Sequence, residues 1–167
     1  MKTIYRITVD PSDADTVCAG MNTFFGAFTG NGGLYRSTDG GANWSKLGDY
    51  PYQDVMTLRF AGTPGRLFVG GWTEADGGLR TTDDGLTFTE VLNQPFVTDI
   101  ADAPGATGAL YATSSATFTP ATGQNAVLYR STDNGTTWAR LRGNLQMTRI
   151  WDITTFPDQP ILPGTLL

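Results

Sequence analysis

The 167-residue chain contains no histidine, and this absence removes several kinds of chemistry. It excludes Ser/His and Cys/His nucleophile–base pairs, His-ligated zinc and histidine acid–base catalysis. Any hydrolytic chemistry would therefore rest on carboxylates, tyrosine or lysine. The single cysteine, Cys18, excludes an intramolecular disulfide, and its apolar surroundings in TVCAG favour a small buried side chain.

Charged residues and long apolar runs are also scarce. Asp, Glu, Lys and Arg make up 16% of the chain, the formal net charge is −5, and Lys and Arg form no cluster. We therefore expect no nucleic-acid partner, because binding phosphates needs clustered basic residues. No apolar run reaches membrane-spanning length, so no membrane partner is expected. The N-terminus MKTIYRITVDP turns polar too early for a signal peptide, which indicates a cytoplasmic protein or a chain without its export signal.

What the sequence does contain is turn-forming and strand-forming residues. There are 21 glycines and 9 prolines, and Thr, Val, Tyr and Phe are spread along the whole chain. No window shows the apolar period of a helix, so the composition predicts short strands and many turns. The predicted fold class is all-β.

One stretch occurs three times, at a spacing of about fifty residues. The copies are GGLYRSTDGGANWSKL (32–47), GGLRTTDDGLTFTEV (77–91) and AVLYRSTDNGTTWARL (126–141). Their aspartates, Asp39, Asp83 and Asp133, lie 44 and 50 residues apart. Before each copy the chain reads as strand, Pro- or Gly-bearing turn, strand. Each unit therefore predicts four antiparallel strands, which is the blade of a β-propeller.

The repeats predict one domain, residues 1–167, that forms part of a β-propeller. Three blades are expected at about 3–50, 51–94 and 95–144, and the start of a fourth at 147–167. Propellers close a ring of about four to eight blades, which hides the blade faces and edges. We therefore expect self-association or further blades to close the ring.

The repeated turn, S/T-x-D-x-G-x-T-W/F, resembles the Asp-box, also called the bacterial neuraminidase repeat. This repeat occurs in sialidases, oligoxyloglucan-type glycosidases, sortilin-like receptors and photosystem II assembly factors. The resemblance extends over nearly the whole chain and implies a β-propeller, and it suggests a secreted or extracellular protein. It does not imply one function, because these relatives include enzymes, receptors and assembly factors.

Turn chemistry gives the repeated stretch a structural role. The carboxylate can accept N–H groups that the hairpin leaves without ladder partners, and the glycine two residues later suits a positive φ. The aromatic residue can pack back over the turn. In the resembling families the box lies at the blade periphery. The residues predicted to be structural are Asp39, Gly41, Trp44, Asp83, Gly85, Phe88, Asp133, Gly135 and Trp138.

Candidate functional residues lie on the inner strands, which line the channel of a propeller. Arg6, Asp99 and Asp152 fall at equivalent positions of their units, and Asp54 is expected on the same face. Together they predict a polar group near one mouth of the channel. Alternatively, the aspartates cap turns and bind backbone groups.

Aromatic residues form a second candidate set. Phe25, Trp72 and Phe118 lie on long loops between the second and third strands of their units, and Trp151 precedes Asp152. Such rings can stack on sugars or pack against blade edges. With Arg6 they are the predicted ligand-binding residues, for a carbohydrate or a protein ligand.

A complete sialidase site is not expected. Tyr5-Arg6-Ile7 resembles part of the sialidase Y/F-R-I-P signature, but Thr8 stands in place of proline. Only two glutamates are present, Glu74 and Glu90, and Glu90 is expected on an outer strand.

The oligoxyloglucan-type enzymes need two opposed aspartates, for which Asp54, Asp99 and Asp152 are the catalytic candidates. The sequence thus predicts a glycan- or protein-binding scaffold without a complete active site. The alternative is a portion of a glycoside hydrolase that uses aspartates.

The segment DPSDAD offers the oxygen ligands that calcium prefers, from Asp10, Asp13 and Asp15. It lacks the glycine and the distal glutamate of an EF-hand loop, and turns of this type between two strands recur in these repeats without metal. We predict neither a metal site nor a cofactor.

Overall fold

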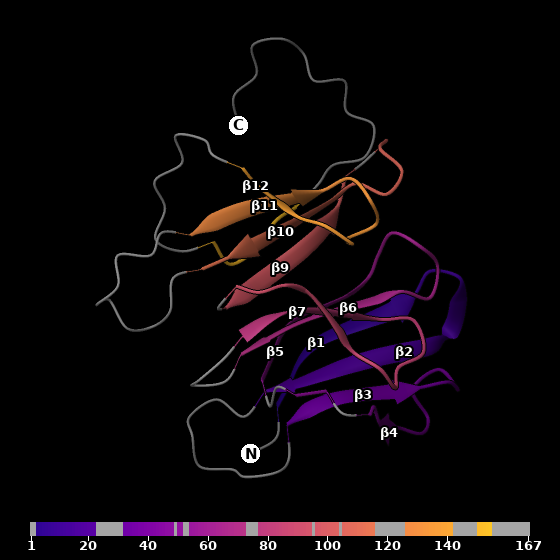
Figure 1. Ribbon diagram of the computed structural model, residues 1–167. Helices are drawn as coiled ribbons and strands as arrows, with labels where there is room; N and C mark the ends of the chain where they lie inside the picture. The colour runs from indigo at the N-terminus through magenta and orange to yellow at the C-terminus, as the bar shows by residue number, and fades with distance from the viewer. Residues whose placement is uncertain are drawn as a thin grey trace.

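The computed structural model describes residues 3–22, 32–48, 50–51, 54–72, 77–94, 96–103, 105–115, 126–141 and 150–154. These residues form three four-stranded antiparallel sheets without a helix, which confirms the predicted all-β class (Figure 1). No helix that could span a membrane occurs in this part of the chain. The strands are β1 (Thr3–Asp10), β2 (Asp13–Asn22), β3 (Gly33–Ser37), β4 (Ser45–Lys46), β5 (Asp54–Phe60), β6 (Leu67–Trp72), β7 (Gly77–Thr82), β8 (Thr89–Leu92), β9 (Val97–Asp102), β10 (Leu110–Ser114), β11 (Val127–Ser131) and β12 (Ala139–Leu141).

Each sheet is a meander in which strands that follow one another in the chain also pair. We refer to β1–β4 as blade 1, β5–β8 as blade 2 and β9–β12 as blade 3. The first strand of each blade contacts the first strand of the next, β1 with β5 and β5 with β9 (Figure 1). These three strands are called the inner strands below.

Two apolar clusters join the blades. The first lies between blades 1 and 2 and contains Cys18, Leu34, Leu58 and Phe60 among its buried residues. The second lies between blades 2 and 3 and is built around Phe68, which is fully buried. Blade 2 is covered on both faces, and this explains why five of the six residues of β6, LFVGGW, are buried.

Glycines on the second strands let neighbouring blades approach closely. A Cβ atom at Gly20 would overlap the side chain of Val55 on β5. A Cβ atom at Gly70 would lie 2.5 Å from Thr57 Cγ2 and 3.0 Å from the carbonyl oxygen of Val97. Both positions therefore exclude any side chain.

Every inner strand has a β-bulge at the same point. The extra residues are Tyr5, Met56 and Thr98, which interrupt the register with the second strand of each blade. Thr57 is the blade 2 equivalent of Arg6 and Asp99, since each of them directly follows the extra residue of its strand. Asp54 lies at the start of β5. The bulge keeps it on the face of Thr57, because their partners Trp72 and Gly70 are two residues apart on β6.

Candidate functional site

The Asp-box turn of blade 1 is held by its own side chains. The hydroxyl of Ser37 donates to Asp39 Oδ1 at 2.7 Å and accepts the N–H of Gly41 at 2.9 Å. Asn43 donates to Asp39 through its side chain at 2.7 Å and its backbone N–H at 2.8 Å. The indole of Trp44 donates to the carbonyl oxygen of Gly41 at 2.9 Å.

The turn of blade 3 repeats this arrangement. Asp133 accepts from the hydroxyl of Ser131 at 2.7 Å and from the backbone N–H of Thr137 at 2.9 Å, and Trp138 donates to the carbonyl oxygen of Gly135 at 3.0 Å. The pKa values of Asp39 and Asp133 both fall to about 2. The main cause is a side-chain hydrogen bond, which Asn43 donates to Asp39 and Thr137 donates to Asp133. Each carboxylate therefore accepts hydrogen bonds from residues of its own turn.

In blade 2 the turn acceptor is Asp84. The hydroxyl of Thr82 donates to Asp84 Oδ1 at 3.0 Å and accepts the N–H of Gly85 at 2.8 Å. Asp84 Oδ1 also accepts the N–H groups of Leu86 and Thr87, at 2.8 and 2.9 Å. These hydrogen bonds lower the pKa of Asp84 below its usual range.

Asp83, which the sequence alignment assigned to this role, forms an ion pair with Arg66 instead, with 2.8 Å between Oδ1 and Nε. The assignment was wrong because the blade 2 turn is one residue shorter. The glycine N–H binds the hydroxyl three residues before it here and four residues before it in blades 1 and 3.

Among the inner-strand carboxylates, Asp99 lies at the centre of a group of contacts. Thr57 donates its hydroxyl proton to Asp99 Oδ1 at 3.2 Å, and the N–H of Ile153 donates to Oδ2 at 2.9 Å. The carboxyl group of Asp152 is in hydrogen-bonding contact with that of Asp99. Burial, followed by the contact with Asp152, raises the pKa of Asp99, because both disfavour its charged form.

Asp99 and Asp152, two of the four predicted polar residues, thus meet. Arg6 donates from Nε to the carbonyl oxygen of Met56 at 3.0 Å, and its guanidinium lies 4.7 Å from the ring centroid of Tyr5. Asp54 pairs with Trp72 where β5 and β6 meet.

The predicted aromatic residues Trp72 and Trp151 are linked by Phe96, which the sequence reasoning missed. Phe96 lies edge-to-face against both indoles, with centroid distances of 5.9 Å to Trp72 and 6.0 Å to Trp151. It is 2% exposed, whereas Trp151 is 43% exposed. The sequence feature that could have identified Phe96 is its position as an aromatic residue directly before an inner strand. Phe25 and Phe118 lie outside the described residues.

Two hydroxyl residues of blade 3, also missed, hold the segment that carries Trp151. Thr98 donates to the carbonyl oxygen of Ile150 at 2.6 Å. The hydroxyl of Ser115 donates to the same oxygen and accepts the N–H of Ile150, both at 2.9 Å. Residues 150–154 are thereby docked on blade 3 through side-chain hydrogen bonds.

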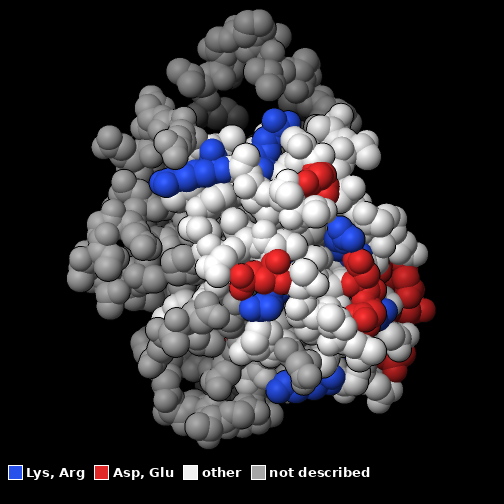
Figure 2. Space-filling model, in the orientation of Figure 1, with Lys and Arg blue, Asp and Glu red and all other residues white. Residues whose placement is uncertain are grey.

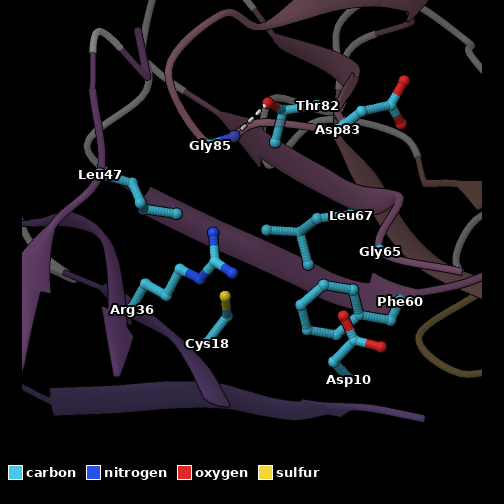
Figure 3. Close-up of a pocket in the computed structure, with 10 residues that line it drawn as sticks. All are labelled: Asp10, Cys18, Arg36, Leu47, Phe60, Gly65, Leu67, Thr82, Asp83 and Gly85. Atoms are coloured by element: carbon cyan, nitrogen blue, oxygen red, sulfur yellow. Dashed lines mark hydrogen bonds between the residues drawn. The ribbon is translucent and has the colours of Figure 1, made fainter. Parts of the chain in front are cut away.

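A cavity of about 70 Å³ lies between blades 1 and 2 (Figure 3). Cys18 and Arg36 of blade 1 face Leu67 and Gly85 of blade 2 across it. Burial raises the pKa of the Cys18 thiol to about 11, so it is a poor nucleophile. The register places Cys18 at the position that Phe68 has in blade 2, so the cavity marks the space that an aromatic ring fills there.

The acidic side chains of the described residues are not arranged as a metal site. No group of three His, Cys, Asp or Glu side chains among them is placed to hold a metal ion. Asp10 and Asp13 of the DPSDAD segment instead accept hydrogen bonds within their turn. Figure 2 shows acidic side chains gathered toward one side of the face in view and basic ones scattered singly.

Comparison with known proteins agrees with this architecture. The BNR/Asp-box repeat model matches residues 35–46 and 129–140, which hold the Asp-box turns of blades 1 and 3. A xyloglucanase from Paenibacillus sp is 33% identical over 113 residues, which cover 54% of this chain and 10% of that protein.

Three solved structures share the fold. An ancestral GH74 enzyme matches with a TM-score of 0.68 and 18% identity, covering 91% of this chain and 20% of that one. The GH74 enzyme of Niastella koreensis matches with a TM-score of 0.63 and 20% identity, covering 83% and 22%. YCF48 bound to a D1 peptide matches with a TM-score of 0.54 and 18% identity, covering 86% and 41%.

The comparisons confirm the similarity to Asp-box β-propellers and the partial propeller fold. The chain spans about a tenth of the length of the xyloglucanase and about a fifth of each GH74 structure.

Proposed function

We propose that this chain contributes a glycan-binding surface to a xyloglucanase-like β-propeller and has no complete active site of its own. The observation that carries the proposal is the row Trp72–Phe96–Trp151 at the starts of the inner strands, beside the carboxyl pair Asp99–Asp152. The 33% identity to a xyloglucanase supports a carbohydrate as the ligand class.

The three aromatic residues combine a buried ring, Phe96, with an exposed one, Trp151. Phe96 is buried and holds both indoles edge-to-face, so the rings are held in position before a ligand arrives. Trp151 remains 43% exposed and can offer a face to a sugar ring. The neighbouring carboxyl groups can bind sugar hydroxyls, and such a combination of apolar surface with a few polar groups is typical of ligand sites.

The carboxyl pair does not have the geometry of a catalytic pair. Glycosidases separate their two carboxyl groups by about 5–5.5 Å in retaining enzymes and about 6.5–9.5 Å in inverting ones. The carboxyl groups of Asp99 and Asp152 interact directly, an arrangement unlike either of these separations.

A portion of a glycoside hydrolase is the second candidate. The raised pKa of Asp99 favours it, because a general acid must keep its proton near the working pH. The second carboxylate would then come from further blades. A peptide ligand has weaker support, since it rests on fold similarity to the peptide-bound YCF48 alone.

Binding of xyloglucan oligosaccharides, measured by isothermal titration calorimetry, tests the glycan proposal. We expect Trp151→Ala to weaken binding about three- to tenfold, because it removes a stacking surface. Trp44→Ala is the matched control, since Trp44 is 40% exposed but lies on an Asp-box turn. Equal losses in both variants, or no binding by the unmodified chain, would contradict the proposal.

Hydrolysis assays separate the two candidates. The unmodified chain, Asp99→Ala and Asp152→Ala are incubated with xyloglucan and with sialyl substrates. We expect no turnover by any of them. Turnover that either substitution abolishes would replace the binding function with a hydrolase.

A further inference from the structure

One face of the inner strand of blade 1 is apolar and exposed. Ile4, Ile7 and Val9 are 60, 62 and 50% exposed, although they alternate along β1 as core residues would. On the opposite face, Arg6 contacts blade 2.

The same face is buried in the other two inner strands. The bulge register makes Leu58 of β5 and Ile100 of β9 the equivalents of Ile7. Leu58 is 6% exposed and Ile100 is 1% exposed, and each packs in the cluster shared with the preceding blade. The exposed face of β1 is therefore the face with which a blade packs onto its predecessor.

Blade 3 has the complementary face, and a short segment already occupies part of it. Residues 150–153 (Ile-Trp-Asp-Ile) are docked there by Thr98, Ser115 and Asp99. Residues 4–7 of β1 (Ile-Tyr-Arg-Ile) have the same pattern, with isoleucines at both ends and an aromatic residue second. The surface of blade 3 that binds residues 150–153 is therefore suited to bind residues 4–7.

Charge favours residues 4–7 over residues 150–153 at this place. Equivalent residues of successive inner strands touch, as Thr57 touches Asp99 at 3.2 Å and Asp99 touches Asp152. Arg6 is the blade 1 residue at this position. With residues 150–153 docked, Asp99 meets a second carboxyl group. β1 would instead bring the guanidinium of Arg6, which has four N–H donors besides the one that binds Met56.

The Asp-box turn of blade 1 also differs from that of blade 3, which packs on the preceding blade. In blade 3 the turn glycine, Gly135, lies against Phe68 of the preceding blade. Among the described residues, an added Cβ atom at Gly41 would meet only Trp44 of its own turn, at 3.6 Å. Tyr111 has on blade 3 the position that Phe68 has on blade 2, so it offers a ring for Gly41 to cover.

We propose that β1 of one chain docks on blade 3 of a second copy and displaces residues 150–153, with Arg6 paired to Asp99 of that copy. Two such contacts close a head-to-tail dimer with six blades in one ring, which is within the usual range for propellers. Docking of β1 removes Trp151 and Asp152 from the proposed glycan-binding surface, so the dimer contact and that surface exclude each other on one blade 3.

A charge exchange tests the dimer. Sedimentation velocity of the full chain should show a species with twice the mass of one chain. Arg6→Asp and Asp99→Arg should each raise the dissociation constant at least about tenfold, because like charges then meet at both contacts. An equimolar mixture of the two variants should dimerise again, since each contact regains one Arg and one Asp.

Two further variants keep the test decisive if the charge variants fold poorly. Ile7→Asp alters only the exposed face of β1 and should give a folded monomer. Ser115→Ala removes a hydroxyl that holds Ile150 and should strengthen dimerisation. An unmodified chain that stays monomeric up to high concentration would overturn the proposal and assign the face to blades of a longer polypeptide. A dimer that survives Ile7→Asp, or a mixture that stays monomeric while both variants are folded, would also overturn it.

Discussion

The ring of Phe68 on β6 lies against Gly135 of the next blade so closely that any side chain at position 135 would overlap it. Gly85 has the same relation to blade 1, where an added Cβ atom would lie 3.0 Å from Leu47 Cδ2. The Asp-box glycine therefore serves two purposes. It adopts the positive φ that the turn requires, and it lets the turn pack on the preceding blade.

Substitution of Gly135 should accordingly cost more than its backbone conformation alone. We expect Gly135→Ala to lower the free energy of unfolding by about 3 kcal/mol, from the positive φ and the overlap with Phe68. Gly105 is the control, because its φ of 70° is similar to the 76° of Gly135 and no atom of the described part of the chain lies within 4 Å of an added Cβ atom. Gly105→Ala should cost about 1 kcal/mol in urea unfolding. Equal costs would show that the overlap is relieved by repacking.

In the blade 2 turn, Asp84 should matter more than Asp83. Asp84→Ala leaves two backbone N–H groups and the Thr82 hydroxyl without their acceptor, so we expect the Tm to fall by about 4 °C or more. Asp83→Ala removes only an exposed ion pair with Arg66 and should change the Tm by about 1 °C. Thermal unfolding followed by circular dichroism measures both. The reverse order would restore the assignment made from sequence alignment.

The contact between Asp99 and Asp152 predicts a pH dependence. Because the pKa of Asp99 is raised in the folded state, its contribution to stability is fully present below about pH 4 and is lost as the pH rises through the raised value. Asp152→Asn removes the opposing charge, so this variant should be more stable than the unmodified chain at pH 7 and similar to it at pH 4.

Urea unfolding at pH 4, 5, 6 and 7 tests this expectation. Asp102→Asn is the control, because it makes the same substitution at a carboxylate that accepts from Arg59 at 2.9 Å and does not face a second carboxyl group in the described contacts. A variant Asp152→Asn with no gain at pH 7 would show that the carboxyl contact has no energetic consequence.

The cavity beside Cys18 should accept a larger apolar side chain. Cys18→Leu adds apolar atoms to a space of about 70 Å³, so we expect the free energy of unfolding to rise by up to about 1 kcal/mol. Ala112 is equally buried but belongs to the packed cluster between blades 2 and 3. Ala112→Leu should therefore destabilise by about 1–3 kcal/mol. Similar losses in both variants would mean that the cavity cannot be filled.

Part of the candidate site followed from the sequence, because equivalent positions of a repeat adopt equivalent places. Asp99 and Asp152 were predicted as equivalents, and their carboxyl groups are in contact. The role of Thr57 was missed because the polar candidates were sought among charged residues, and no residue pattern marks the bulges that align Thr57 with Asp99. Phe96 was missed because it precedes its strand and so lies outside the alternating pattern.

The blade 2 turn shows the limit of alignment more directly. The letters TTDDG fit the repeat with either aspartate as the acceptor, since two threonines precede two aspartates. Only the end of β7 at Thr82 and the hydrogen bonds to Asp84 decide between them.

The all-β class and the repeated turn could be predicted from residue order, because the hydrogen bonds of that turn join residues only two to four positions apart. Such contacts depend on residue type and spacing, which can be read directly. The tertiary structure alone decided how blades join, because those contacts link residues 42 and 54 positions apart, as Thr57 links to Asp99 and Asp99 to Ile153. Their partners are set by bulges and by close packing at glycines, and these arise only when neighbouring sheets are brought together.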